Sequence, residues 1–271
     1  IIHMKNLEIY CVTNKTLNYL DQSNYNIGWV GNEIPAKNYI LCNSEDNIFY
    51  KEKYYSELTF QYWYWKNKLR VEENNWIGFC QKRRFWIKKK SKNVIIDNDN
   101  FINHILSDAP EDWNGFDSII CEPIFVNRVK KIKMLKRGII PLLKNPSIFF
   151  NENKQSLAFH FDMHHGFGNL KKAINLIDVE DRLDFLNFVN TSTSYNPHIM
   201  FIAKPEIANR WFSVLFPWLL RCEKEFGFKE LKGYDTQRLY AYLAERYLSF
   251  WFNKHTKTLT WPWTIFDISK N

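Results

Sequence analysis

The chain has 271 residues, of which 45% are hydrophobic and 17% aromatic, and its formal net charge is +8. No run of about 18 apolar residues occurs, so no membrane-spanning helix is expected, and five scattered cysteines exclude a zinc site built on a Cys-x-x-Cys pair. The basic excess favours a polyanionic partner: a nucleotide diphosphate, nucleic acid or an anionic membrane surface. Because the start lacks an export signal, a cytoplasmic protein is expected, and residues 1–4 read as a remnant that ends in a start methionine.

The first half of the chain alternates strand-like and helix-like patterns. Runs of β-branched and apolar residues predict strands, a stretch with two glycines and a proline predicts a loop, and aromatic residues at helical spacing predict a helix. The predicted strands are residues 6–13, 38–42, 75–80 and 117–120, the loop is 24–37 and the helix is 53–68. Strands separated by helices indicate an α/β sheet with some parallel pairing, which binds ligands beyond the carboxyl ends of its strands.

The second half is expected to be mainly helical. Helices are predicted at residues 168–177, 180–189, 205–226 and 236–253, with a short strand at 198–203. Pro205 fits the first turn of the third of these helices, whereas Pro217 is expected to kink it. The tail around Trp261-Pro262-Trp263 is expected to pack against the fold.

Two blocks carry a resemblance to a known family. Residues 57–67 read ELTFQYWYWKN and residues 76–86 read WIGFCQKRRFW. They resemble the family catalogued as domain of unknown function 4422, which has an E-L-T … Y-W-x-W-K-N helix and then a strand ending in G-x-x-H-Y-R-R-x-F. The segment YNPHIMFIA at 195–203 and the Ala244-Glu245-Arg246 … Trp251 segment also fit, so the resemblance spans roughly residues 6–252.

This resemblance implies a fold and an activity. Family members are similar to A-type glycosyltransferases of capsule and cell-surface polysaccharide synthesis, which implies a glycosyltransferase-A-like nucleotide-binding sheet flanked by helices, with a helical C-terminal part. Residues 5–271 would form one glycosyltransferase domain, with a nucleotide-sugar half (5–125) and a helical acceptor half (126–271). The donor would be a nucleotide sugar, with uridine diphosphate favoured, and the acceptor a growing surface glycan, free or lipid-linked. The basic, aromatic surface would then rest against the inner face of the cell membrane, and no nucleic acid is expected as a partner.

Several positions depart from the family pattern. Gln81 and Lys82 stand where the family usually has His and Tyr, Ile199 stands where it has Asn, and Asn169 stands near a usual acidic position. Because of these departures, the alternative remains that this chain is a noncatalytic family member that binds glycan. Aromatic residues interleaved with Lys and Arg keep open another class, a basic nucleic-acid-binding protein.

The retained arginine pair is the first candidate for donor binding. Arg83 and Arg84 end a predicted strand, and guanidinium groups match the phosphate oxygens of a nucleotide diphosphate, which gains charge as the sugar leaves. The alternative is that one arginine pairs with Glu57 to fix the fold. Thr13, at the end of the first strand, Glu57 and Lys66 are assigned to the same donor side.

The second candidate is the segment HFDMHH at residues 160–165. If it is extended, His160, Asp162 and His164 share one face, which could bind a divalent ion or position a general base. Asp162 is then predicted to take the proton of the acceptor hydroxyl in an inverting reaction, with His164 or His165 aligning it or binding a substrate. The alternative is that the imidazoles cap the next helix or form hydrogen bonds in a polar core.

Candidates for a metal and for the acceptor side are weaker. A-type transferases usually bind Mn²⁺ or Mg²⁺ through Asp-x-Asp, so a metal is expected by analogy, but the only match, Asp97 and Asp99, is better explained as a surface turn. Glu122 is an alternative carboxylate at a strand end. Glu245 and Arg246, on the last predicted helix, are assigned either to the acceptor side or to an ion pair inside the fold.

Overall fold

The computed structural model describes residues 6–267, so the predicted remnant at residues 1–4 lies outside the described residues. Its main sheet begins with four parallel strands in the order β3-β2-β1-β4 and continues through β9, β6 and β10. The four parallel strands are β1 (Leu7–Thr13), β2 (Asn26–Trp29), β3 (Ile40–Leu41) and β4 (Trp76–Gln81). β9 (Phe201–Ala203) runs antiparallel to both β4 and β6 (Ser118–Cys121), whereas β10 (Thr258–Trp261) is parallel to β6.

Shorter strands extend this framework. β5 (Arg84–Trp86) forms a hairpin with β4 and pairs antiparallel with β11 (Trp263–Ile265), while β7 (Ile124–Phe125) pairs with β8 (Ser194–Tyr195). The chain after residue 126 therefore supplies three strands to the sheet that the first half begins.

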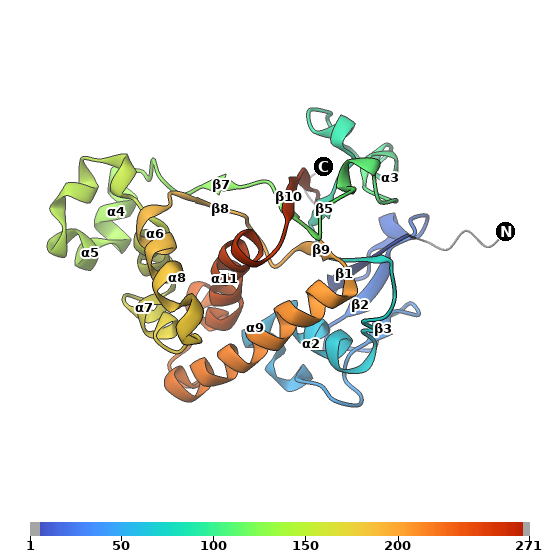
Figure 1. Cartoon of the computed structure of the whole chain (residues 1–271), viewed down its shortest axis with the longest axis horizontal. Helices are drawn as coiled ribbons and strands as arrows, with labels where there is room; N and C mark the ends of the chain where they lie inside the picture. Colours follow the sequence, from blue (N-terminus) through green and yellow to red (C-terminus); the bar gives the residue numbers. More distant parts are fainter. Residues whose placement is uncertain (1–5, 268–271) are drawn as a thin grey trace.

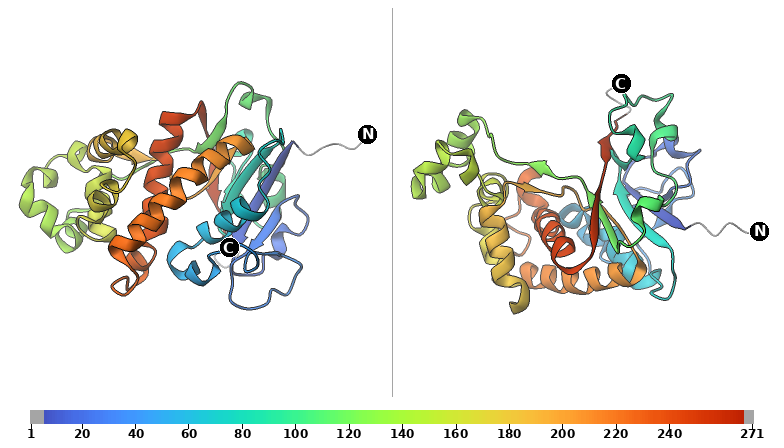
Figure 2. Two further views of the ribbon diagram at one scale, coloured as in Figure 1. Left: turned by 60° about the horizontal axis from the view of Figure 1, so that its bottom comes forward. Right: turned by 45° about the horizontal axis from the view of Figure 1, so that its top comes forward.

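The helices form two groups. α1 (Glu52–Tyr55), α2 (Leu58–Asn67) and α3 (Phe101–His104) lie close to the sheet, and the long helices α9 (Pro205–Phe226) and α11 (Leu239–His255) lie side by side next to it (Figures 1 and 2). The second group lies beyond α11, at the end of the molecule away from the sheet (Figure 1). It consists of α4 (Lys131–Arg137), α5 (Ile139–Lys144), α6 (Leu157–His165), α7 (Asn169–Ile174) and α8 (Val179–Thr191), and a single turn, α10 (Tyr234–Gln237), precedes α11.

The core lies on both faces of the sheet. Along β1, Leu7, Ile9 and Cys11 pack into one cluster of buried residues, while Val12 packs into the other. Such burial of both faces is typical of parallel sheets covered by other elements. All five cysteines are buried and free. Among the described residues, no helix has both the length and the apolar character needed to cross a membrane.

The predicted α/β class is confirmed, but two details of the first half are wrong. The expected loop at 24–37 contains strand β2. Gly28 does not mark a turn there but allows close packing, because a Cβ at Gly28 would lie 2.5 Å from the Phe60 ring of α2. The expected buried strand at 38–42 shortens to β3, at the edge of the sheet, where Leu41 is 43% exposed.

The helix predicted at 53–68 is divided in two. Ser56, with φ of 52°, ends α1 before α2 begins. The long helix predicted at 205–226 is confirmed, and it continues through Pro217. The tail packs as expected and also pairs as β10 and β11.

The extended conformation considered for residues 160–165 is wrong. These residues belong to helix α6, whose first turn is capped by Ser156: its Oγ accepts a hydrogen bond from the Phe159 N–H at 3.3 Å. In a helix, His160 and His164 share a face, whereas Asp162 points to nearly the opposite side. The three side chains therefore do not form the single face that an extended strand would give.

Candidate functional site

The strand order changes direction between β1 and β4. From β1 the sheet grows through β2 to β3 on one side, and the chain then returns to place β4 on the other side of β1. In open α/β sheets, ligands bind beyond the carboxyl ends of the strands at such a switch point. Here those ends are Thr13 of β1 and Gln81 of β4.

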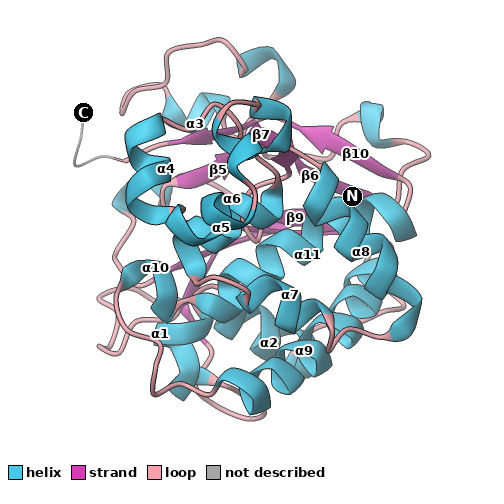
Figure 3. Ribbon diagram, turned by 90° about the vertical axis from the view of Figure 1, so that its left-hand side faces the viewer, coloured by secondary structure: helices cyan, strands magenta, loops and turns pink. Residues whose placement is uncertain are grey.

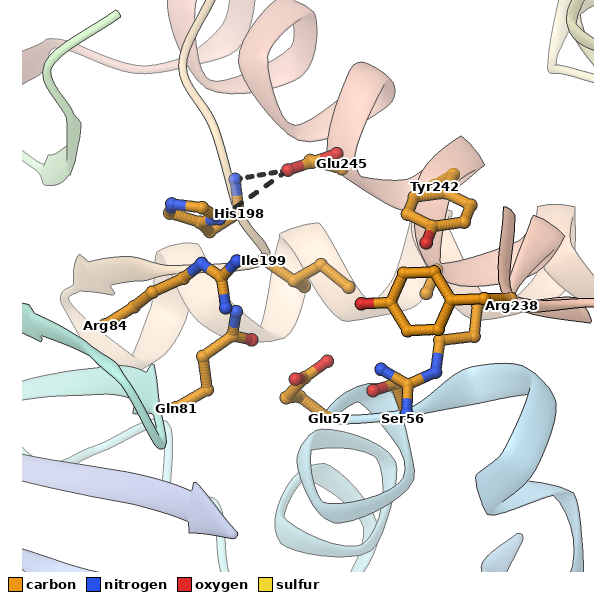
Figure 4. Close-up of a pocket in the computed structure, with 11 residues that line it drawn as sticks. Ser56, Glu57, Gln81, Arg84, His198, Ile199, Arg238, Tyr242 and Glu245 are labelled. Atoms are coloured by element: carbon orange, nitrogen blue, oxygen red, sulfur yellow. Dashed lines mark hydrogen bonds and ion pairs between the residues drawn. The ribbon is translucent and has the colours of Figure 1, made fainter. Parts of the chain in front are cut away.

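A cavity of about 110 Å³ lies beside the carboxyl end of β4, and we call it the strand-end cavity (Figure 4). It is lined from four parts of the chain: the junction of α1 and α2, the hairpin between β4 and β5, the segment before β9, and the start of the last helical region. The lining residues are Ser56, Glu57, Gln81, Arg84, His198, Ile199, Tyr234, Arg238, Ala241, Tyr242 and Glu245.

Unusual backbone conformations occur around this cavity. Ser56, Arg83 and His198 have φ values of 52°, 73° and 67°, a region that residues other than glycine seldom adopt. Ser56 and His198 line the cavity, and Arg83 directly precedes Arg84 in the hairpin. Such conformations cost free energy and concentrate at functional sites, so the backbone supports placing the functional site here.

Positive charge gathers at the switch point. Burial lowers the pKa of Lys82, and the neighbouring cations Lys15 and Arg83 lower it further, with Arg238 also contributing. Lys15 follows β1 and Lys82 follows β4, so the cations stand at the two strand ends. Because its charge is penalised by burial and by like charges, Lys82 would be stabilised by an anion bound there.

Arg84 brings a guanidinium group into the cavity itself. Its Nε is buried without a hydrogen-bond partner among the described residues. A buried unpaired donor costs free energy, and an anionic ligand is a suitable partner for it. In Figure 4 the Glu57 carboxylate points into the space between Arg84 and Arg238.

The two carboxylates of the cavity differ in their bonding. Glu57 precedes α2 without forming a side-chain cap, and its carboxylate accepts no hydrogen bond from any residue between 6 and 267. Glu245 is occupied at both oxygens: one accepts the backbone N–H of His198 at 2.5 Å and the other pairs with Arg246 at 2.7 Å. Glu57 is therefore available to a substrate, whereas Glu245 fixes the wall and also bridges to an arginine.

His198 is neutral at physiological pH. Burial, followed by the charge of Arg84, lowers its pKa to about 3. Its Nε2 is buried without a hydrogen-bond partner among residues 6–267, and its ring meets Trp263 edge to face. A neutral imidazole of this kind can bind a hydroxyl group of a ligand.

His165 and Arg246 support the cavity wall from behind. The His165 ring stacks on Tyr242 with 3.8 Å between ring centroids, and its Nδ1 lies 2.7 Å from the Asp235 carbonyl oxygen. Burial, with a smaller contribution from Arg246, lowers its pKa to about 3. Arg246, only 1% exposed, lies 3.9 Å from the Tyr195 ring. Both residues hold elements that line the cavity, but neither lines it.

The other predicted catalytic residues lie outside the strand-end cavity. The Asp162 carboxylate accepts the backbone N–H of Gly168 at 2.9 Å, at the start of α7, and burial raises its pKa. The Nδ1 of His164 lies 3.0 Å from the guanidinium of Arg137, and burial lowers the pKa of this imidazole to about 4. These contacts match the alternative structural interpretation of the histidine segment.

Of the predicted donor-side residues, Glu57 and Arg84 line the cavity. Thr13 is buried at the end of β1, where its Oγ1 bonds the backbone of Lys15. Arg83 is half-exposed and pairs with Asp267 at 2.8 Å. Lys66 lies at the opposite end of α2 from Glu57, with its ammonium 3.9 Å from the Trp65 ring centroid.

The residues predicted for a metal do not line the strand-end cavity. Asp97 and Asp99 occupy an exposed turn, where Asp97 accepts the N–H groups of Asp99 and Asn100. Glu122 pairs with Lys92 at 2.7 Å, outside the cavity. Within the described part of the chain, no three His, Cys, Asp or Glu residues are placed to hold an ion. The expected Mn²⁺ or Mg²⁺ therefore stays a prediction.

Sequence reasoning missed part of the lining. His198 and Ile199 belong to the segment at 195–203 that resembles the family, and Gln81 departs from the family pattern. The sequence therefore pointed to these three lining residues. Arg238 and Tyr242, together with Tyr234, gave no signal. Arg238 and Tyr242 lie at the start of α11, which packs against α1, and Tyr234 lies on α10, which contacts α6.

Comparisons with known proteins agree with this description. The sequence matches the family described as "Domain of unknown function (DUF4422)" over residues 8–257. No curated protein matches it. The structure is similar to a solved apo structure of the bifunctional glycosyltransferase WbbM, with a TM-score of 0.68 and 18% sequence identity. The match covers 96% of this chain and 45% of that chain, so this chain spans less than half of WbbM. The predicted glycosyltransferase-like α/β fold is confirmed, and the chain belongs to the DUF4422 family.

Proposed function

We propose that this protein is a glycosyltransferase that moves a sugar from a nucleotide sugar, with uridine diphosphate as the favoured leaving group, to a growing surface-polysaccharide acceptor carried on a lipid. One observation carries the proposal. At the β1/β4 switch point, the cations Arg84 and Arg238 line the cavity together with Glu57, whose charge also acts on the nearby Lys82, and the Glu57 carboxylate accepts no hydrogen bond from a described residue. Inverting glycosyl transfer uses both features, a cationic site for the leaving diphosphate and a base for the acceptor.

The donor side uses the cations. When the bond between the anomeric carbon and the diphosphate breaks, negative charge develops on the leaving phosphate oxygen. The planar guanidinium of Arg84 can donate two hydrogen bonds to phosphate oxygens, and Lys82 adds a positive charge that an anion would stabilise. Transfer therefore becomes easier because these charges are held in place by the hairpin before the reaction begins.

The acceptor side uses Glu57. Its carboxylate takes the proton of the acceptor hydroxyl while that oxygen forms a bond to the anomeric carbon and the diphosphate leaves with the bonding electrons. Glu57 thus replaces Asp162 as the proposed base, because Asp162 lies outside the cavity and its carboxylate already accepts the Gly168 N–H. His198, through its neutral Nε2, would bind a sugar hydroxyl.

Residues from both parts of the chain line this cavity. Ser56, Glu57 and Arg84 come from the first half, whereas His198 and Arg238 come from the second. This placement supports a donor-binding half at residues 5–125 and an acceptor half at residues 126–271, with the reaction at their boundary. The protein of similar structure, WbbM, is described as a bifunctional glycosyltransferase, which also supports the proposal.

The test is a donor screen with purified protein. Nucleotide sugars, including furanose donors, are incubated with and without lipid-linked glycan acceptors, and released nucleotide is measured. We expect acceptor-dependent release from one donor, and from the uridine diphosphate series first. Silence across the whole panel, with folded protein, would contradict the proposal.

A second function, glycan binding without turnover, is favoured by one observation. Gln81 and Ile199, two of the positions that depart from the family pattern, both line the strand-end cavity. A noncatalytic member would bind nucleotide or glycan, as measured by calorimetry, and release no nucleotide. Turnover that disappears on substitution of Glu57 would rule this alternative out.

A further inference from the structure

Helices α4 and α5 expose an unusual number of large apolar side chains. Most large apolar residues of the protein are buried, yet this short segment exposes five in succession: Ile132 69%, Leu135 52%, Ile139 48%, Ile140 49% and Leu143 75%. In α4, Ile132 and Leu135 are three residues apart and share a helix face. In α5, Ile139, Ile140 and Leu143 lie within about 100° of one another around the helix.

The exposure is not a sign of a loosely attached segment. Met134 and Leu142 point inward and pack with Ile148, Phe159 and Met163 in a small core of their own. Each helix therefore has an inner apolar side that anchors it to α6 and an outer apolar side that no described residue covers. Figures 1 and 3 show α4 and α5 at the end of the molecule farthest from the sheet, on its outside.

The same segment carries most of the net charge of the protein. Between residues 128 and 144 there are seven Lys or Arg residues and no Asp or Glu, a net charge of +7 in a chain whose total is +8. Arg128 pairs with Glu152 and Arg137 with Asp235, but the five lysines form no salt bridge with a described residue. These are Lys130, Lys131, Lys133, Lys136 and Lys144.

We propose that the α4–α5 surface, meaning these five exposed apolar residues and the five lysines beside them, docks onto an anionic phospholipid bilayer. A surface that combines exposed apolar side chains with a dense positive charge matches a lipid interface with anionic headgroups. The lysines are attracted to the headgroups, and the apolar side chains insert at the boundary of the acyl region. Nucleic acid would use the charge but leave the apolar side chains exposed.

Docking here would place the strand-end cavity near the membrane. Arg137, the last residue of α4, pairs with Asp235 at 3.0 Å, and Asp235 follows Tyr234, which lines the cavity. His165 also bonds the Asp235 backbone and stacks on Tyr242 in the cavity wall. A lipid-borne acceptor would thus reach the cavity from the membrane side; this last step rests on the proposed function, whereas the lipid binding itself does not.

The test is vesicle flotation without any nucleotide sugar, so that a failure to bind lipid is distinct from a failure to transfer sugar. The purified chain is mixed with vesicles of phosphatidylcholine alone or of phosphatidylcholine with phosphatidylglycerol. We expect flotation with the anionic vesicles and little with the neutral ones. Lys131→Gln/Lys133→Gln/Lys136→Gln should weaken binding by on the order of 100-fold, because each lysine contributes independently to attraction at the surface.

The apolar contribution has a matched control. Ile140→Ser/Leu143→Ser should lower vesicle binding by about tenfold or more. Val179→Ser/Leu183→Ser removes two apolar side chains from α8 that are at least as exposed, 79% and 76%, and should leave binding unchanged. Lys224→Gln/Lys229→Gln/Lys232→Gln removes the same charge elsewhere and should have a smaller effect than the α4 triple variant. Unchanged thermal unfolding shows that every variant is folded.

Three outcomes would overturn the proposal. Equal binding by the Ile140/Leu143 variant and the wild type would show that the apolar side chains do not insert. Loss of single-stranded oligonucleotide binding in parallel with lipid binding, only in the charge variants, would indicate a general polyanion site. A change of oligomeric state in the Ile140/Leu143 variant without lipid would assign the surface to a second copy of the chain.

Discussion

The hairpin between β4 and β5 and the histidine-rich helix α6 both concentrate ionisable side chains, but the fold uses them differently. At the hairpin, Arg84 ends beside an open cavity at the switch point of the sheet. On α6, the imidazoles of His160 and His165 are surrounded by protein, and burial lowers their pKa values to about 2 and about 3. Under the proposed function, the place of an ionisable group relative to the strand ends decides its role.

The carboxylates of the two regions, Asp162 on α6 and Glu57 at the cavity, differ in their hydrogen bonding. Asp162 of α6 accepts a backbone hydrogen bond at the start of α7, whereas Glu57, facing the cavity, accepts no hydrogen bond from a described residue. Substitutions at the cavity should therefore change catalysis, whereas substitutions on α6 should change stability. The contrast would be wrong if cavity substitutions changed only stability and α6 substitutions changed only catalysis.

The largest effect is expected for Glu57→Gln. The substitution keeps the shape of the side chain but removes the base, so kcat should fall by about 10³-fold, within the range for general-base catalysis. Because Glu57 makes no capping hydrogen bond, thermal unfolding should be unchanged. Steady-state nucleotide release with a saturating donor measures the effect, and a variant that retained wild-type turnover would exclude Glu57 as the base.

The next effect is expected for Arg84→Gln. Removing a charge that faces the leaving diphosphate should lower kcat/KM for the donor by about 100-fold. The neighbouring Arg83→Gln is the matched control, since Arg83 is half-exposed and pairs with Asp267, and it should change donor kinetics by only a few fold. Equal losses in both variants would mean that the hairpin acts through its general charge.

The sequence predicted the framework of the fold better than the site. Strand β1 and helix α9 were predicted nearly residue by residue, because buried strands and long amphipathic helices have strong periodic signals. Strand β2 was missed because Gly28, required for close contact with Phe60, looks like a turn residue in the sequence.

Part of the site could not be predicted for a different reason. Glu57 and Arg84 belong to recognisable blocks, but Arg238 and Tyr242 depend on the packing of α11 against α1, which joins residues nearly 200 positions apart. The segment at 160–165 misled because its alternating residues fit an extended strand, whereas the Ser156 cap and the neighbouring apolar residues support a helix.

On the α6 side, Asp162→Ala should lower the free energy of unfolding by about 1–2 kcal/mol, because the Gly168 N–H loses its acceptor. Turnover should remain close to that of the wild type. Asp162→Asn keeps an acceptor oxygen at the same place, so it should recover most of the stability. Chemical denaturation and nucleotide release measure the two properties, and a large loss of kcat in Asp162→Asn would restore Asp162 as the base.

The smallest effect concerns the pH dependence of stability. His165 has a folded-state pKa of about 3, below its value of about 6.5 in an unfolded chain. A lowered pKa means that the neutral form is favoured in the folded state, so its contribution is fully present above about pH 6.5 and is lost as the pH falls toward the folded-state pKa.

Between pH 7.5 and pH 5.5, this loss amounts to about 1 kcal/mol for His165. His165→Gln cannot take up the proton, so its free energy of unfolding should fall by about 1 kcal/mol less than that of the wild type over the same interval. Denaturant titrations at the two pH values measure the difference, and any constant cost of losing the stacking on Tyr242 cancels because it is present at both. Equal pH dependence in the two proteins would mean that His165 gains or loses its proton at the same pH in the folded and unfolded chain, and the contrast between a buried α6 and an open strand-end cavity would then fail at this residue.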